Sequence, residues 1–553
     1  YRRIIGKTYK SMNGSTYCVH MHLKRVTSKH KGKTYEYAQI VKSVRREDGK
    51  SSIEVVKSLG RMESEEDWER AEKIKEAMEK DEKIVRLKDV EIEKQFELGL
   101  GWVAEELWDR HGIGKSLMNA FESRKHEFDP EKIAFMLTVN RLYRPGSDLS
   151  AYRWIRERGW PRVEIEKQWV YRTLDPLVEE KEEIEKNMLQ ELKNNLDLDL
   201  SLVFYDLTSS YFEGEGPELA KFGYSRDKRK DKKQLVLGVV MADSVPIAHR
   251  VWPGNTDDSS TLEKTVQDLK DRFGIEEMVF VADRGVFKGN LEDLDHNYIG
   301  SVKKRKSNLS EKLLPKNVPG SKEKRTAEIH TDGKKRYILC LDEDRREKDL
   351  ENLEETVEEG ESFLEDLEQR FKSKGRGRPM TEEGAWKRIH KNLGRSKRLF
   401  QIKVEEKNRK IEWELDQEAL EYEKTIAGKF LLVTTTDLKP DKVMEEYKNL
   451  KDVEQAFDDL KNILKLRPIG HRTSKRAKGH IFICILSLIL AKLMEKHTGR
   501  TFENMKEKLE PLKTNQIKIH GEKIYKRNTI NPEQEEILSE LDVEKPPKTL
   551  VNV

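Results

Sequence analysis

Two aspartates, Asp206 and Asp283, each follow a run of apolar residues with the pattern of a buried strand, at 202–205 and 278–282. A carboxylate that ends a buried strand projects beyond the sheet edge, where a divalent cation replaces the water that it lost. Two such acids and a third would hold two Mg²⁺ ions about 3.5–4 Å apart, as phosphodiester chemistry requires. Each aspartate taken alone is also explained by a turn or a helix cap, so both interpretations stay open.

A third acid, Glu454, lies in a segment with helical spacing. Its expected buried stripe consists of Val453, Phe457, Leu460 and Leu464. Tyr447, Glu454 and Lys461 recur every seven residues, so in an α-helix they share one face beside that stripe. An acid for a metal ion, with a tyrosine and a lysine for phosphate, suits a DNA-cleaving site. A solvated helix surface is the alternative interpretation.

The spacing of Tyr447, Glu454 and Lys461 resembles the Y-(2)-R-(3)-E-(6)-K signature of IS-four-type DDE transposases, which bacterial insertion sequences encode. The sequence YDLTS, which contains Asp206, and the sequence VADRG, which contains Asp283, resemble the first two acidic motifs of that family. The arginine position of the signature is occupied by Leu450, with Lys451 next to it. That phosphate contact is therefore either missing or supplied by Lys451.

The resemblance implies a DNA transposase that binds the terminal inverted repeats of its element. It would catalyse DNA cleavage and strand transfer in cut-and-paste transposition. Asp206, Asp283 and Glu454 would be the catalytic residues and the ligands of two Mg²⁺ ions, for which Mn²⁺ is expected to substitute. The expected partners are double-stranded DNA, both transposon ends and target, and a second copy of the chain in a homodimer.

Charge clustering and the resemblance together give a set of candidate DNA contacts. Residues 464–478 contain six Lys or Arg and no acid, which favours phosphate neutralisation over a solvated loop. Residues 221–233 contain seven Lys or Arg, and for them DNA contact and a solvated loop are equally good interpretations. The RGRP sequence at 376–379 is similar to a minor-groove hook, but a flexible linker explains it better. The candidate contacts are Tyr447, Lys451, Lys461, Arg467, Arg284, Arg472 and Lys475.

The elements that must position these residues suggest a multi-domain chain, α/β in its core and α+β overall. Three strands, a helix and two further strands follow one another between 200 and 302, the order of a ribonuclease H-like mixed sheet. A helical and β-containing insertion interrupts this core, and a mainly helical DNA-binding region precedes it. The expected segments are a β-rich start (1–60), a helical DNA-end-binding region (61–198), the first core part (199–305), the insertion (306–428), the second core part (429–495) and a helical tail (496–553).

Composition agrees with a protein that acts on DNA. The net charge of the 553 residues is only +4, because strongly acidic and strongly basic segments offset one another. Residues 343–370 hold 13 acids and 4 bases, whereas residues 371–400 hold 10 bases and 2 acids. Three cysteines without a motif suit a reducing compartment, and the longest apolar stretch, 481–491, is shorter than the about 20 residues that span a bilayer. We expect a cytoplasmic, nucleoid-associated protein without a membrane partner.

Two other functions remain compatible with the residues. One is a metal-dependent nuclease that cuts DNA without strand transfer, and the other is an inactive, transposase-derived DNA-binding regulator. The three acids argue against the regulator, since unneutralised carboxylates repel a DNA backbone. The sequence contains no zinc-ligand pattern and no GxxxxGK[ST] phosphate loop.

Overall fold

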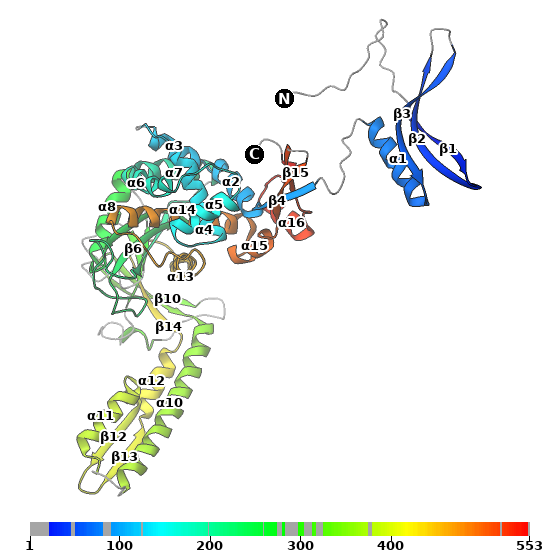
Figure 1. Cartoon of the computed structure of the whole chain (residues 1–553). Coiled ribbons are helices and arrows are strands. Elements are labelled where there is room, and N and C mark those ends of the chain that lie inside the picture. Colours follow the sequence, from blue (N-terminus) through cyan, green and yellow to red (C-terminus); the bar gives the residue numbers. More distant parts are fainter. Residues whose placement is uncertain are drawn as a thin grey trace. The chain divides into compact units, whose positions relative to one another are not determined.

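The chain separates into two compact units, which are described one at a time (Figure 1). Residues 1–94 and 515–526 form the first, and residues 95–514 and 527–553 form the second. The computed structural model describes residues 21–45, 50–80, 90–122, 125–196, 198–257, 259–273, 279–282, 297–302, 312–316, 325–373, 379–519 and 522–550.

The first unit contains an antiparallel sheet in the order β1-β2-β3. Its strands are β1 (Met21–His30), β2 (Lys33–Arg45) and β3 (Ser51–Met62). Helix α1 (Glu65–Glu79) packs against this sheet. It begins at Glu65 because the Ser64 hydroxyl accepts a hydrogen bond from the Asp67 amide while the Asp67 carboxylate accepts one from the Ser64 amide. The short β-like runs of the sequence at 35–41 and 52–56 lie within β2 and β3.

The second unit begins with the expected run of helices. They are α2 (Gly99–Arg110), α3 (Ile113–Phe121), α4 (Pro130–Tyr143), α5 (Asp148–Glu157), α6 (Lys167–Glu179) and α7 (Lys181–Leu196). Helix α4 is buried along almost its whole length and packs against α2, α3, α5 and α6, which makes it the centre of this helical region.

The core of the second unit is an eight-stranded sheet in the order β10-β11-β14-β9-β8-β5-β6-β7. Five of its strands are β5 (Leu202–Tyr211), β6 (Gln234–Ala242), β7 (Val245–Pro253), β8 (Val279–Ala282) and β9 (Asn297–Ser301). β5 pairs antiparallel with β6, and β6 with β7, whereas β8 runs parallel to both β5 and β9. Helix α8 (Ser259–Phe273) provides the crossover to the parallel strand β8. This is the expected ribonuclease H-like arrangement of a mixed sheet.

Three strands extend the sheet beyond β9 in an antiparallel manner: β14 (Lys429–Thr434), β11 (Lys335–Leu341) and β10 (Thr326–Asp332). β10 and β11 come from the segment that the sequence assigned to the insertion. The sheet of the core is therefore wider than the sequence predicts, and the excursion from it starts after β11.

That excursion comprises α10 (Glu343–Lys372), α11 (Glu382–Leu393), the 3₁₀ turn η3 (Ser396–Leu399), β12 (Phe400–Glu405), β13 (Lys410–Leu415) and α12 (Gln417–Ile426) (Figure 1). The buried apolar residues of α10, which include Leu364, Leu367 and Phe371, pack against α11 and β13 of the same chain. Position 360 of α10 is a glycine, because a Cβ there would lie 2.5 Å from Cζ of Phe400. Trp386 and Trp413 pack against this small core.

Helix α14 (Ser474–Thr498) is the central helix of the second unit and packs against α4, α6 and β7. Its length and composition would allow it to span a membrane, but 94% of its most apolar window is buried inside the protein. The eleven-residue apolar stretch in the sequence is thus the part of a core helix that contacts both the helical region and the sheet.

The C-terminal segment is more than the expected helical tail. Helix α16 (Pro532–Glu540) forms where predicted, and α15 (Phe502–Leu509) precedes it. A four-stranded sheet in the order β17-β16-β15-β4 contains β15 (Lys513–Ile519), β16 (Glu522–Arg527), β17 (Thr549–Leu550) and β4 (Val90–Glu97). These strands escaped prediction because inward positions of β15 carry polar residues, Thr514 and Gln516, which are both buried.

Candidate active site

Asp206 lies in the middle of β5 rather than at its end. The strand continues to Tyr211 because the polar residues 208–210 are buried and pair with β6. In the described part of the chain, the last pair of the parallel ladder between β5 and β8 is that of Phe204 and Val281. The half-buried Asp206 lies two residues further along β5 than Phe204.

Asp283 and Arg284 follow Ala282, the last residue of β8. Both lie outside the described residues. Their proposed roles therefore stay predictions from the sequence.

Glu454 is carried by α13 (Pro440–Asp458), which packs against both β5 and β8. Pro440 occupies the first turn of the helix, where its missing N–H costs nothing. The buried side of α13 includes Val443, Leu450, Val453 and Phe457, whereas Glu454 is exposed. The sheet and the helix thus bring together the strand with Asp206, the end of β8 and the helix with Glu454.

The helix changes its hydrogen bonding after Glu454. Residues Asp459–Ile463 form the π-helical segment η4, in which the Leu464 amide donates to the Asp459 carbonyl at 2.8 Å. A π-helical turn has a different angular spacing from an α-helical turn. The seven-residue rule therefore holds from Tyr447 to Glu454 but does not fix the direction of Lys461.

Asp227, in the loop after β5, joins two of the candidate DNA contacts. Its carboxylate forms ion pairs with Lys461 Nζ at 3.0 Å and with Arg467 Nη1 at 2.6 Å. The guanidinium of Arg467 also lies 5.1 Å from the ring centroid of Tyr211, at the end of β5. The loop after β5 and the segment after η4 are thus held together.

The other candidate DNA contacts have varied surroundings. Tyr447 is half-buried, with its ring 6.1 Å from that of Phe430 on β14. Lys451 and Arg472 are exposed. Lys475 forms an ion pair with Glu179 at the end of α6. Leu450, at the arginine position of the signature, is buried in the core and offers no phosphate contact.

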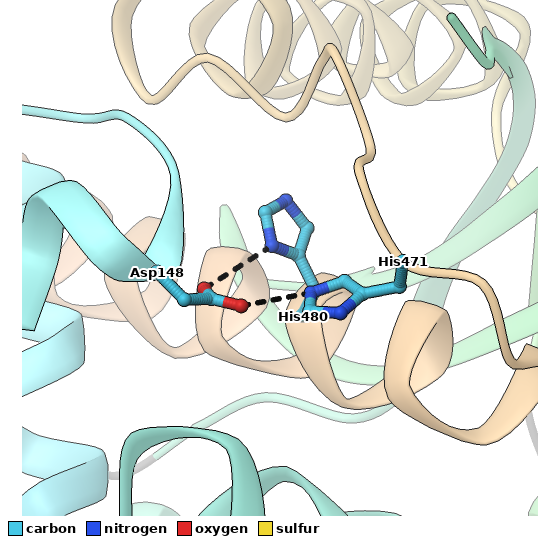
Figure 2. A group of neighbouring side chains, drawn as sticks. All are labelled: Asp148, His471 and His480. Carbon is cyan, nitrogen blue, oxygen red and sulfur yellow. Dashed lines mark ion pairs between the residues drawn. The ribbon is translucent and has the colours of Figure 1, made fainter. Parts of the chain in front are cut away.

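A buried polar group that the sequence did not reveal anchors the segment after η4. Figure 2 shows the carboxylate of Asp148, at the start of α5, between the imidazoles of His471 and His480. His471 Nε2 lies 2.9 Å from one oxygen and His480 Nδ1 lies 3.8 Å from the other. Arg141 of α4 completes the group by donating to the Lys465 carbonyl at 3.0 Å.

A carboxylate with two imidazoles is also a ligand set for a transition metal. However, Arg141 Nη2 lies 3.1 Å from both ring nitrogens of His480. This fixed positive charge opposes a divalent cation at the same place. We interpret the group as a structural link that holds residues 464–471 against α4 and α5. No sequence signal identifies it, because Asp148 and the histidines are far apart along the chain.

The Asp148 group should make the protein sensitive to acid. Burial alone would raise the pKa of Asp148, but the hydrogen bond from His471 and the nearby charge of His480 outweigh it and hold the pKa well below its usual range. A lowered pKa contributes stability above the unfolded-state value of about 3.9, which is lost as pH falls further. We expect Asp148→Asn to lower the free energy of unfolding by about 3 kcal/mol near pH 7 and by progressively less below about pH 4. Urea unfolding across this pH range measures the difference.

Asp175→Asn is the matched control for this experiment. Asp175 also pairs with α14, through Arg476, but at 3.6 Å and with a side chain that is 31% exposed. A weak surface pair is worth at most about 1 kcal/mol. An Asp148→Asn penalty that is the same at pH 3 and pH 7 would contradict the assignment.

Comparison with known proteins places these elements in a family. Residues 197–490, more than half of the chain, match the model of the transposase DDE domain, and residues 23–89 match the N-terminal domain of IS1634 family transposases. A solved synaptic complex of the piggyBac transposase with hairpin DNA is similar at 10% identity and a TM-score of 0.35, covering 74% of this chain and 78% of that chain. A comparison with curated proteins found no match. The family matches fall on β1–β3 with α1 and on the region from β5 into α14.

Proposed function

The chain belongs to the DDE transposases of insertion-sequence type, and we propose that it cuts its element at the terminal inverted repeats and joins the ends to target DNA. The observation that carries this proposal is the meeting of β5, β8 and α13. Asp206 and Glu454 come from the first and last of these elements, and Asp283 follows the second.

Asp206, Asp283 and Glu454 are proposed to hold two Mg²⁺ ions, with Mn²⁺ as a substitute. Carboxylate oxygens are the ligands that Mg²⁺ prefers, and the half-buried Asp206 and exposed Glu454 leave a side open to solvent. Bound there, the metal ions would activate a water or 3′-hydroxyl and stabilise the leaving oxygen. The contribution of the chain is to fix the carboxylates on a strand and a packed helix, so that they need little rearrangement when DNA binds.

The candidate DNA contacts are proposed to hold phosphates on either side of the cut. Lys461 and Arg467 both form ion pairs with Asp227, and the group around Asp148 fixes the segment that carries Arg467. Tyr447, Lys451, Arg472, Lys475 and Arg284 complete the proposed set. The IS-four-type assignment rests on Tyr447, Glu454 and Lys461 and departs from the signature at Leu450.

A homodimer is part of this proposal, because cut-and-paste transposition requires two transposon ends to be held together. Each copy would bind one end, with DNA as the partner of both. A cytoplasmic protein associated with the nucleoid follows from the same proposal.

One experiment separates this function from its alternatives. The protein is incubated with the terminal DNA of its element, Mg²⁺ and a supercoiled target plasmid, and the products are resolved on a gel. Joined products support a transposase, and cleaved ends without joining identify a nuclease. End binding without either product would identify a regulator and contradict the proposal.

A further inference from the structure

The loop between β5 and β6 carries two unusually exposed aromatic side chains. Phe222 is 59% exposed and Tyr224 is 79% exposed. The other large apolar side chains that are exposed in the described part of the chain are aliphatic: Ile53, Val55, Val56, Ile92, Met118 and Leu149. Aromatic rings left in water on a folded loop are unfavourable by themselves, so a binding partner is the natural explanation.

The backbone beneath these rings is fixed. Lys221 and Gln234 exchange two backbone hydrogen bonds, of 3.0 and 2.9 Å. The buried Gln234 side chain donates to the Tyr224 carbonyl at 2.8 Å. Gly223 lies so close to Gly254 that a Cβ would be 1.9 Å from the Gly254 carbonyl oxygen. The two rings are therefore presented by a rigid support, which lowers the entropic cost of binding.

This loop is tied to both elements of the proposed active site. The Arg226 amide donates to the Ser209 hydroxyl at 3.0 Å, three residues beyond Asp206 on β5. Asp227 pairs with Lys461 and Arg467, which follow the helix of Glu454. Phe222 and Tyr224 thus lie shortly before Arg226 and Asp227, which contact the strand of Asp206 and the segment that follows the helix of Glu454.

The charge of the loop identifies the class of partner. Residues 221–233 contain seven Lys or Arg and two acids. Both acids are in ion pairs, Asp227 as described and Asp231 with Arg229 at 2.7 Å. Positive charge beside exposed aromatic rings is the combination that binds single-stranded nucleic acid, because each base stacks on a ring whatever its sequence.

We propose that Phe222 and Tyr224 form a stacking platform for unpaired bases of the DNA beside the cut. The platform rests on the proposed function, since it takes DNA to be the substrate. It adds that the enzyme binds a locally opened end more tightly than a fully paired one. The rings hold the displaced bases, while the lysines and arginines of the loop contact their phosphates.

Anisotropy titrations of the full chain in EDTA test the platform without any cleavage. The probes are fluorescein-labelled dT20 and a blunt 20-bp duplex of mixed sequence. Stacking is worth about 1–3 kcal/mol per base, so Phe222→Ala with Tyr224→Ala should weaken dT20 binding by roughly tenfold or more. Duplex affinity should stay within about twofold, because phosphate contacts dominate it.

Two control variants make the result specific. The exchange of the rings, Phe222→Tyr with Tyr224→Phe, should keep the affinity for dT20. Lys228→Ala with Lys230→Ala should weaken both probes and reduce the salt dependence of binding. Tyr224→Ala alone removes an almost fully exposed ring, so its effect on dT20 is measured on a folded protein.

Unchanged dT20 binding by the alanine pair, or an equal loss on both probes, would overturn the platform. A change in mass by light scattering without a change in DNA binding would also overturn it and assign the rings to a protein contact. These outcomes are independent of the cleavage assay. If the wild-type protein cleaves DNA but the alanine pair still binds dT20 normally, only the platform is refuted. If the alanine pair loses dT20 binding but the wild-type protein does not cleave, only the transposase function is refuted.

Discussion

Asp206→Asn should reduce Mg²⁺-dependent cleavage of transposon ends by about 10³-fold or more. Asparagine keeps the shape of the side chain but offers one neutral carbonyl oxygen in place of a charged carboxylate. Metal ions in such sites stabilise the transition state by several kcal/mol, and each 1.36 kcal/mol is a factor of ten in rate. Glu454→Gln removes the proposed metal ligand on α13 and should have a similar effect. Cleavage rates on labelled end DNA and binding of the same DNA in Ca²⁺ are measured together.

Asp452→Asn is the control on the same helix. Asp452 is two residues before Glu454 and accepts a hydrogen bond of 2.6 Å from the Ser244 hydroxyl, on the turn between β6 and β7. The variant removes the same charge from α13, so we expect cleavage within about threefold of wild type, in line with a surface substitution. DNA binding should persist in all three variants, since phosphate contacts supply it. Cleavage that persists in Asp206→Asn would reject the site assignment.

Much of the catalytic core could be predicted because its strands are local patterns. Runs such as 235–241 and 278–282 are continuously apolar, and this is how a strand buried on both faces appears in a sequence. Pairing between distant segments left no such pattern. β10 and β11 join the sheet through β14, almost 90 residues further along the chain, so the sequence placed them in the insertion. The full length of β5 was missed since its second half is polar but buried.

The candidate site was predictable where helical spacing or a strand pattern marks a residue. Glu454 is exposed beside the buried stripe of α13, as the spacing indicates. The π-helical segment after it was not predictable, because Asp459 is stabilised by Lys492 of α14 at 2.7 Å rather than by local preference. Arg141 and Asp148 gave no signal either, since their partners come from the loop after η4 and from α14.

A second buried group joins the helical region to the catalytic sheet. Glu185 of α7 is almost completely buried. One of its oxygens lies 2.8 Å from His249 Nδ1 on β7, and the other lies 2.7 Å from Arg272 Nη1 of α8 and 2.6 Å from Lys181 Nζ. Burial raises the pKa of Glu185, but Lys181, His249 and Arg272 outweigh it and hold the pKa well below its usual range. Burial also lowers the pKa of Lys181 to about 8 and that of His249 to about 4.

Glu185→Gln should therefore be among the most destabilising single substitutions in the second unit. It leaves the buried cations of Lys181 and Arg272 without their shared counter-charge, which lowers the free energy of unfolding by about 3–5 kcal/mol and Tm by on the order of 5 °C. Glu182→Gln, one turn earlier on α7, removes the same charge from a side chain that is 66% exposed and 3.4 Å from Arg250, and should cost at most about 1 kcal/mol. Calorimetry and urea unfolding of both variants measure the contrast. Equal costs would mean that the ion pairs of Glu185 are not what stabilises the junction of α7, β7 and α8.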